Sequence, residues 1–385
     1  MGRNKKLQEI DLSLNSLVVF RKLLTHEVIL PLRALLDTET MDPMIQLRQY
    51  TEFISRLYAR STNLTEYIFR LICEDDNFYV RAVARGEEPD EMLRACVQNE
   101  LAILQRLARI RPHELQKEVS YYGVLPEWNN ADIDFGAEYH ARLREIGKYG
   151  FGQFARHTVF TVQEGRLVPV LHPDPASLPE LYGYAAERQR VIDNTAALLR
   201  GGRAQDILLF GGTGTGKSVT VKAAANSFAA EGLRLIEITQ EQLSQIPAVI
   251  EAVYENPLKF ILYIDDLDLH ADDSGLRTLK ASLEGSAASR AGNTVIYATS
   301  SAVTDADPER LPEPMRGLAA RFGLRIGFGA QQQAEYLDFV EKYAAQAGLK
   351  ADPEKLRQAA EDYAAQHGGY SPRTAKQMIE QLGNG

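Results

Sequence analysis

A glycine-rich run constrains the fold of this chain more than any other feature of its 385 residues. It reads Gly211-Gly212-Thr213-Gly214-Thr215-Gly216-Lys217-Ser218 and fits G-x-x-x-x-G-K-[ST], a pattern whose backbone N–H groups cradle phosphates. The apolar stretch Ile207-Leu208-Leu209-Phe210 precedes it, and a helical pattern over Val219–Phe228 follows. Because this motif occurs where a strand turns into a helix, both flanks support it. The sequence therefore predicts a phosphate-binding loop in an α/β fold, rather than a glycine-rich turn without function.

The residue types in this loop suit a nucleoside triphosphate. Glycines adopt backbone conformations closed to other residues, so N–H groups can approach the phosphates, and the helix N-terminus adds partial positive charge. Lys217 can reach the β- and γ-phosphates, and the Ser218 hydroxyl can ligate Mg²⁺. The predicted cofactors are ATP and Mg²⁺, with nucleotide contacts from Gly211, Gly212, Thr213, Gly214, Thr215, Gly216, Lys217, Ser218 and Val219.

An acidic strand end is the second feature that carries chemistry. The apolar run Phe260-Ile261-Leu262-Tyr263-Ile264 is followed by Asp265 and Asp266. Asp265 is predicted to hold Mg²⁺, directly or through water, and Asp266 to polarise the attacking water, with Asp268 as the local alternative. Many buried strands end in Asp, so this pattern alone is weak evidence for a metal site. It becomes strong evidence because a phosphate-binding loop lies upstream at a suitable spacing.

Three further side chains are candidates for the reaction. Ser301 follows the strand pattern Thr294–Thr299, where a polar group can touch the γ-phosphate; the alternative is an ordinary strand end. Arg321 precedes the last strand pattern and could stabilise transition-state charge on a neighbouring subunit's nucleotide, although taken alone it resembles a solvated surface arginine. Arg373 lies in the first turn of the last predicted helix and could lean onto the phosphates from a lid.

The pattern along the chain divides it into four parts. Apolar helical stripes mark residues 1–120 as an N-terminal helical domain. A higher density of aromatic residues, Gly and Pro marks residues 121–180 as a mixed connector, with a short hairpin around Glu164-Gly165. Residues 181–330 alternate short apolar strands with helices, as expected for a parallel sheet buried on both faces. Residues 331–385 contain three helical stretches that form a lid. The predicted strands are Asp206–Phe210, Arg234–Ile238, Phe260–Asp265, Thr294–Thr299 and Leu324–Phe328.

Charge and cysteine content argue against some classes of protein and indicate the cellular compartment. The formal net charge of −9 argues against broad non-specific binding to nucleic acid or anionic lipid, which draws on clustered Lys and Arg. Cys73 and Cys96 fit buried thiols in a reducing cytosol better than a disulfide. The N-terminus lacks the apolar core of a signal peptide, and no apolar run approaches the ~18 residues of a membrane span. The sequence predicts a cytoplasmic protein without a membrane span.

Taken in order, the loop, the acidic strand end, Ala298-Thr299-Ser300, Arg321 and the helical C-terminus resemble AAA+ ATPases. More narrowly, the chain is similar to a bacterial AAA+ family catalogued as domain of unknown function 815 (DUF815), over residues 160–385. That likeness rests further on Leu181-Tyr182-Gly183-Tyr184, Leu235-Ile236-Glu237-Ile238, Asp265-Asp266-Leu267, Leu283-Glu284-Gly285 and Arg321-Phe322-Gly323-Leu324. The resemblance implies a P-loop NTPase (AAA+) αβα sandwich: a five-stranded parallel sheet, a C-terminal helical lid and an N-terminal mainly helical domain.

The resemblance also implies roles for the residues that precede the sheet. Tyr182, Gly183 and Tyr184 would line the adenine pocket, with Val191 and Asn194 nearby.

The chain departs from the family pattern at three single positions and, most of all, in the loop Ala302–Pro314. Asp266 stands where such ATPases usually carry Glu, Ser301 where the family tends to have Asn, and Thr213 where a basic residue is common. The first two departures bear on the rate of hydrolysis and on the γ-phosphate contact, for which Ser300 or Ser301 would substitute.

The favoured function is a motor or switch that hydrolyses ATP to ADP and phosphate. Arg321 would act in trans within a homo-oligomer, and movement of the lid would reach an unknown protein partner through the N-terminal helices.

Three other functions stay open. A nucleic-acid-associated ATPase similar to a helicase loader would use the basic cluster Arg142, Arg144, Lys148 and Arg156, but is not favoured because charge runs are usually solvated faces. A P-loop small-molecule kinase fits less well, since such kinases usually cover their substrate with loops inserted in the core. A regulatory scaffold that binds ATP with little turnover is kept open by the Asp266 and Ser301 departures.

Overall fold

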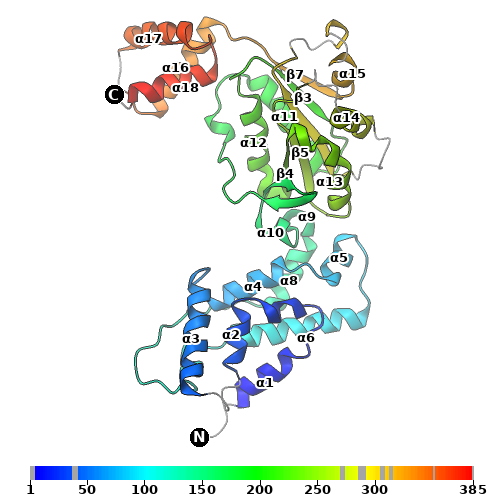
Figure 1. Cartoon of the computed structure of the whole chain (residues 1–385), viewed down its shortest axis with the longest axis vertical. Coiled ribbons are helices and arrows are strands. Elements are labelled where there is room, and N and C mark those ends of the chain that lie inside the picture. Colours follow the sequence, from blue (N-terminus) through cyan, green and yellow to red (C-terminus); the bar gives the residue numbers. More distant parts are fainter. Residues whose placement is uncertain are drawn as a thin grey trace. The chain divides into compact units, whose positions relative to one another are not determined.

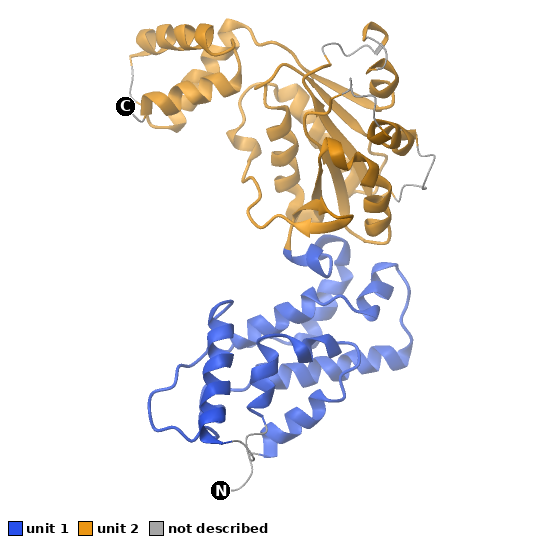
Figure 2. Ribbon diagram, in the orientation of Figure 1, with its two compact units in different colours: residues 1–156 blue, residues 157–385 orange. Residues whose placement is uncertain are grey.

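The computed structural model describes residues 5–36, 42–268, 274–284, 292–303, 308–311, 315–349 and 352–383. The chain divides into two compact units, residues 1–156 and 157–385, coloured separately in Figure 2. This division falls between Arg156 and His157, whereas the sequence assigned residues 121–180 to a separate connector. None of the helices within the described ranges is long and apolar enough to cross a membrane.

The first unit consists of helices (Figure 1). Side-chain caps determine where several of them begin: Asn63 accepts a hydrogen bond from the Glu66 N–H, and Asp90 accepts one from the Leu93 N–H. The helices are α1 (Lys5–Leu14), the 3-10 helix η1 (Arg21–Thr25), α2 (Ile29–Ala34), α3 (Pro43–Tyr58), α4 (Leu64–Glu74), α5 (Phe78–Ala84), α6 (Glu91–Ala108), α7 (Pro112–Gln116), α8 (Phe135–Arg144), α9 (Ile146–Tyr149) and α10 (Gln153–Arg156).

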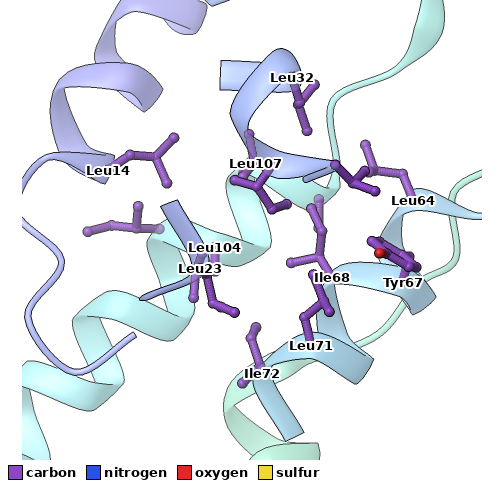
Figure 3. Packing of buried hydrophobic residues seen from close by; sticks show 14 of the residues in the cluster. Leu14, Leu23, Leu32, Leu64, Tyr67, Ile68, Leu71, Ile72, Leu104 and Leu107 are labelled. Atoms are coloured by element: carbon purple, nitrogen blue, oxygen red, sulfur yellow. The ribbon is translucent and has the colours of Figure 1, made fainter. Parts of the chain in front are cut away.

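The apolar stripes of these helices meet in one core, part of which Figure 3 shows. Leu14 of α1, Leu32 of α2, Ile68 of α4 and Leu104 of α6 are almost fully buried there. Burial of each such side chain contributes about 1.5–3 kcal/mol. The first unit therefore has a hydrophobic core of its own.

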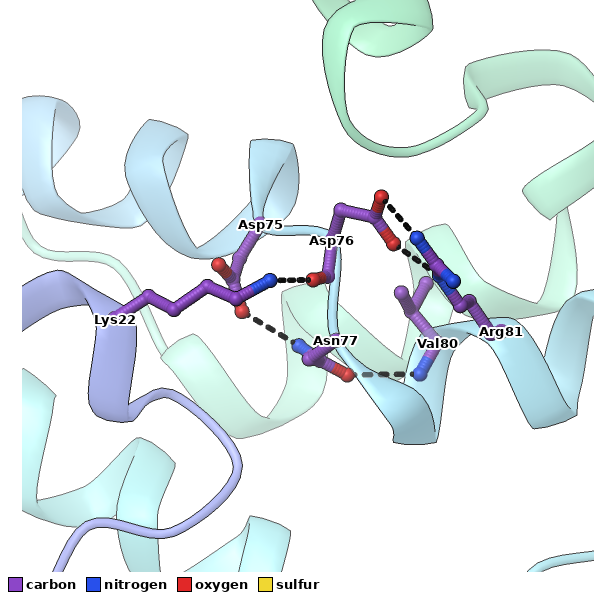
Figure 4. Close-up of polar contacts among 6 residues, drawn as sticks. All are labelled: Lys22, Asp75, Asp76, Asn77, Val80 and Arg81. Atoms are coloured by element: carbon purple, nitrogen blue, oxygen red, sulfur yellow. Dashed lines mark hydrogen bonds and ion pairs between the residues drawn. The ribbon is translucent and has the colours of Figure 1, made fainter.

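A polar junction connects η1, α4 and α5 (Figure 4). Asn77 caps α5 by accepting from the Val80 N–H at 2.9 Å, and donates to the Asp75 carboxylate at 2.8 Å. Lys22 donates to the Asp76 carbonyl at 2.7 Å. Burial raises the pKa of Asp75, against the opposing effect of the Asn77 hydrogen bond. These contacts satisfy the polar groups of the tight α4–α5 turn, which the apolar core could not do.

The second unit contains a seven-stranded sheet, in the order β2-β1-β4-β5-β6-β3-β7. All neighbouring pairs are parallel except β1 with β2. The strands are β1 (Val159–Gln163), β2 (Arg166–Pro169), β3 (Ile207–Gly211), β4 (Leu233–Ile238), β5 (Lys259–Ile264), β6 (Thr294–Ser300) and β7 (Leu324–Phe328).

The prediction of a five-stranded parallel sheet is therefore wrong in strand number. The hairpin expected in the connector forms β1 and β2, and β1 pairs with β4, so it continues the sheet. The pairing gives β4 a second hydrogen-bonded neighbour and covers an edge that would otherwise expose unpaired N–H and C=O groups.

Helices cover the sheet. Val191 and Leu198 of α11 and Val221 and Ala224 of α12 pack with Ile207 of β3 in one buried cluster on one face of it. The helices between the strands are the 3-10 helix η2 (Leu178–Glu180), α11 (Ala185–Leu199), α12 (Lys217–Phe228), η3 (Ala229–Glu231), η4 (Gln240–Gln245), α13 (Ile246–Val253), α14 (Ser274–Glu284), η5 (Pro308–Arg310) and α15 (Met315–Ala319).

The three helices that follow β7 are called the lid here: α16 (Gln333–Gln346), α17 (Pro353–Gln366) and α18 (Pro372–Gly383). They surround a small core of their own, formed by Tyr336, Phe339, Val340, Leu356 and Met378 among others. The breaks between them contain Gly348, with φ 68°, and Gly368, with φ 92°, backbone conformations that favour glycine.

Candidate functional site: a loop, two acids and a lid

The predicted phosphate-binding loop lies between β3 and α12 (Figure 1). Gly211 has φ 129°, and a Cβ built on it would lie 2.2 Å from the Phe328 carbonyl oxygen, so glycine is needed where β3 meets β7. Gly214 and Gly216 have φ 82° and 92°, and the Thr215 side chain donates to a loop carbonyl at 2.9 Å. The loop ends at the N-terminus of α12, whose free N–H groups and dipole favour an anion.

Gly211→Ala is expected to destabilise the second unit by about 3–5 kcal/mol, because the added methyl meets backbone and the residue is strained. Gly201→Ala is the matched control: its φ is 71°, but no atom of the described residues lies within 4 Å of the added Cβ, so it should cost only about 1 kcal/mol. Urea unfolding followed by circular dichroism measures both. Fluorescence of the single tryptophan, Trp128, reports the first unit and should not shift. Equal stability of the two variants would contradict this account.

Lys217 is held against the loop. Its Nζ donates to the carbonyls of Gly211 and Gly212, both at 2.8 Å, and the residue is only 7% exposed. Burial lowers the pKa of Lys217, while the charges of Asp266 and Asp265 act in the opposite direction. An ammonium group has three donors, so Nζ retains one for a phosphate oxygen.

Asp265 follows β5 directly and accepts three hydroxyl hydrogen bonds on Oδ1. The donors are Ser218 Oγ at 2.6 Å, the Tyr263 hydroxyl at 2.7 Å and Thr299 Oγ1 at 2.8 Å. Burial alone would raise the pKa of Asp265, but these hydrogen bonds outweigh it and hold the pKa below its usual value. A charged carboxylate therefore lies beside the Ser218 hydroxyl, and these are the two residues that the sequence predicts as Mg²⁺ ligands.

Asp266 is held in an unusual backbone conformation. Its φ of 48° lies in the left-handed region, which costs a non-glycine residue about 1–3 kcal/mol. Its N–H donates to Thr299 Oγ1 at 2.8 Å, and its Oδ1 accepts from Ser301 Oγ at 2.6 Å. Two hydroxyls at the end of β6 thus orient both acids, and such strain is common where side-chain direction matters for function.

A cavity of about 730 Å³ lies over the loop and the acids, within the range of small-molecule sites. Its other walls are the segment 174–181 and the lid helices α16 and α18. The predicted site residues that line it are Thr213, Gly214, Gly216, Lys217, Ser218, Val219, Asp265, Asp266, Ser301 and Arg373.

Arg373 connects the lid to the loop. Its N–H donates to the Gly214 carbonyl at 3.4 Å, and a Cβ built on Gly214 would lie 3.3 Å from the Arg373 Cβ. Besides burial, the positive charge of Arg373 contributes to the lowered pKa of Lys217. Two cationic side chains therefore line one cavity at a helix N-terminus, an arrangement that suits a polyanion.

Two of the residues predicted for the adenine pocket contact the lid. The Tyr182 ring packs edge-on against Tyr343 of α16, with centroids 4.8 Å apart. Gly183 has φ 74°, and an added Cβ would lie 2.4 Å from the Phe339 ring. Neither residue is among those that line the cavity, whereas Tyr343 is.

Tyr184 and its neighbours on α11 make packing contacts. The Tyr184 hydroxyl donates to the Gly329 carbonyl at 2.6 Å, and Val191 is fully buried. The Asn194 side chain is hydrogen bonded to the backbone of Gln205, accepting from its N–H and donating to its carbonyl. These three side chains fix α11 to the sheet beside the cavity rather than lining it.

Arg321 lies apart from the other candidates. Its Nε pairs with Glu284 at the end of α14, at 3.0 Å, and the two side chains are 48% and 33% exposed. It does not line the cavity over the loop. The structure thus brings together Lys217, Ser218, Asp265, Asp266, Ser301 and Arg373 and leaves Arg321 outside this group.

Sequence reasoning gave no role to Tyr263 or to Asn226. The signal for Tyr263 was available, because residues two apart on a strand share a face and Asp265 follows two positions later. Asn226 of α12 donates to the carbonyls of Asp174 and Ala176, both at 2.9 Å, and so holds the segment that forms one cavity wall. No local pattern could have found that long-range contact.

The loop after β3, the acids after β5 and the lid define the class: this is a P-loop NTPase-like α/β fold of the AAA+ kind. The family model described as "Protein of unknown function (DUF815)" matches residues 154–304 and 305–385, more than half of the chain. The chain belongs to that family, which confirms the resemblance seen in its sequence.

Solved structures with a similar fold include RuvB from Thermotoga maritima, described as a Holliday junction branch migration motor. It is 18% identical with a TM-score of 0.40, and the match covers 55% of this chain and 65% of that one, less than two thirds of RuvB. The AAA domain of FIGL-1 in complex with ADP is 15% identical with a TM-score of 0.40, covering 56% and 74%. No curated protein matches the sequence.

Proposed function

We propose that the second unit binds ATP with Mg²⁺ in the cavity over the loop and hydrolyses it to ADP and phosphate. The observation that carries this proposal is the 2.6 Å contact between the Ser218 hydroxyl and the Asp265 carboxylate, beside the loop that holds Lys217. Hydroxyl and carboxylate oxygens are the donors that Mg²⁺ takes, and the helix N-terminus suits the phosphates. These residues therefore fit both halves of a magnesium–nucleotide complex.

Each charged side chain has a distinct part in this proposal. When bound, Mg²⁺ would neutralise charge on the phosphates, held by Ser218 and Asp265. Lys217 and Arg373 bind phosphate oxygens from the loop and from the lid. Asp266 accepts a hydrogen bond from the attacking water, and its carboxylate is already oriented by a hydroxyl donor at 2.6 Å.

Asp266→Asn is the variant that tests hydrolysis. It is expected to bind ATP as the wild type does and to release phosphate about 10²-fold more slowly, because an amide cannot accept the proton. Phosphate release is measured without any added acceptor, which separates hydrolysis from transfer to a small molecule. Wild-type protein that binds ATP but releases no phosphate would contradict the proposal and favour an ATP-binding scaffold instead.

Arg321 supports a homo-oligomer as the active form. Its side chain is about half exposed, lies outside the cavity of its own chain and, among the described residues, pairs with Glu284. In the proposed assembly it reaches the γ-phosphate in the cavity of a neighbouring copy, where it stabilises charge that develops during hydrolysis.

The first unit supplies the partner-binding surface in this proposal. Tyr121, Tyr122 and Val124 are exposed by 47%, 107% and 96% in one loop of that unit. Exposed aromatic and aliphatic side chains close together are typical of protein-binding sites. A protein partner of the first unit is therefore part of the proposed function.

Nucleic acid is not proposed as that partner. Three of the four residues of the basic cluster are engaged internally: Arg142 and Lys148 both lie over the Tyr149 ring, at 4.4 and 5.3 Å, and Arg156 pairs with Glu74 at 3.1 Å. Phosphate binding would compete with these contacts.

A further inference from the structure

The Asp265 carboxylate lies between two cavities. It lines the cavity over the loop and a second cavity of about 300 Å³ at the ends of β4 and β5, whose walls include Lys222, Glu237 and Tyr263. A side chain with open space on both sides is not fixed by packing. Hydrogen bonds must therefore hold this carboxylate toward the loop.

Three hydroxyl groups donate to Asp265, and the hydrogen bond from Ser218 cannot persist once a metal ion is bound. The Ser218 oxygen lies at the loop and is the one proposed to turn to the metal, so its hydrogen bond to Asp265 is given up when the site fills. Tyr263 and Thr299 remain, at 2.7 and 2.8 Å. Thr299 also accepts from the Asp266 N–H at 2.8 Å, so its hydroxyl is shared between the two acids rather than dedicated to Asp265.

Tyr263 is placed for this task by the strand itself. It is 1% exposed in β5 and lies two residues before Asp265, so both side chains leave the same face of the strand. A buried tyrosine hydroxyl needs a hydrogen-bond partner, and the one its described contacts give it as donor is Asp265 Oδ1. Because the buried ring is rigid, its hydroxyl group also restricts the position of Asp265 Oδ1.

We propose that Tyr263 is a positioning residue for magnesium: its hydroxyl pins one oxygen of Asp265, so that the carboxylate is presented to the metal in a single orientation. The inference rests on the proposed function and deepens it. Groups that orient a metal ligand from behind typically change metal affinity by about 10–100-fold when they are removed. Tyr263 contacts neither the metal nor ATP in this arrangement.

Tyr263→Phe tests the inference, because it removes one buried oxygen and keeps the ring. Calorimetric titration of ATP at a series of Mg²⁺ concentrations gives the Mg²⁺ concentration at which tightening of ATP binding is half complete. That concentration is expected to rise about 10-fold. ATP affinity in the presence of EDTA is expected to stay at the wild-type value, which also shows that the variant is folded.

Tyr297→Phe is the matched control. Tyr297 is the cross-strand partner of Tyr263 in β6 and is fully buried, but its hydroxyl is bonded to Asn194 and Thr195, at 2.9 and 3.0 Å. Its removal should lower thermal stability without moving the Mg²⁺ dependence. A Tyr263→Phe protein with wild-type Mg²⁺ dependence, or one that matches Tyr297→Phe, overturns the inference. Wild-type protein whose ATP binding ignores Mg²⁺ overturns the proposed metal site itself.

Discussion

Lys217→Ala is expected to lower ATP turnover by about 10³-fold and to weaken ATP binding. The ammonium group has one free donor and lies among the loop carbonyls beside the two acids, so it is the nearest positive charge to a phosphate on the loop. The folded protein should survive the change. Since burial lowers the pKa of Lys217, folding disfavours its charged form at neutral pH, and removing that charge should not reduce the free energy of unfolding.

Lys259→Ala is the control for this variant. Lys259 begins β5, at the opposite end of the strand from Asp265, and burial lowers its pKa as well. Its loss should leave turnover within about 2-fold of the wild type, as for a change remote from the site. If the two variants lost turnover equally, or if Lys217→Ala kept it, the cavity over the loop would not be the site of hydrolysis.

Arg321→Ala is expected to lower turnover by about 10³-fold while ATP binding stays unchanged. For the wild type, turnover per chain should rise with protein concentration as copies assemble, and the variant should lose that rise. The reason is that Arg321 lies outside the cavity of its own chain and, in the proposed assembly, serves the cavity of a neighbour. Phosphate release measured over a dilution series checks both expectations.

Glu284→Gln distinguishes between two roles of Arg321: an action on the nucleotide of a neighbouring copy, and a structural role in the ion pair with Glu284. The Arg321–Glu284 pair is partly exposed, so as a structural contact it is worth only about 0–1 kcal/mol. Freeing Arg321 from Glu284 should keep turnover at the wild-type level or raise it. Equal loss of turnover in the two variants would mean that the ion pair, and not the reach of Arg321, is what matters.

The site could be predicted from sequence where the signal is local. The loop needs only consecutive residues between a strand and a helix, and Lys217 and Ser218 are part of it. Asp265 and Asp266 follow a parallel strand, and the carboxyl ends of parallel strands meet at one edge of the sheet. The positions of these four residues at one site could therefore be predicted from their spacing in the sequence.

Contacts between distant segments could not be predicted in the same way. The turn at Glu164-Gly165 indicates a hairpin, but the parallel register Val159↔Leu235 that adds it to the sheet has no local signature. A strand's own pattern decides which face is buried and says little about which edge it joins.

The residues predicted for the adenine pocket were also placed without knowledge of a long-range contact. The contacts of Tyr182 and Gly183 with α16 depend on how the lid folds back against the start of α11. Position in a family motif does not contain that information.

The central claim is that Ser218 and Asp265 hold the magnesium of a bound ATP molecule in the cavity of the second unit. A crystal structure with a non-hydrolysable ATP analogue and Mn²⁺ in place of Mg²⁺ tests it most directly, because manganese is located by its own anomalous scattering. The account predicts one manganese peak within bonding distance of Ser218 Oγ, at or near the ~2.0–2.1 Å of a Mg²⁺ ligand, close to the Asp265 carboxylate and with the triphosphate over Lys217. A nucleotide bound elsewhere, or a manganese peak with neither residue beside it, would contradict it.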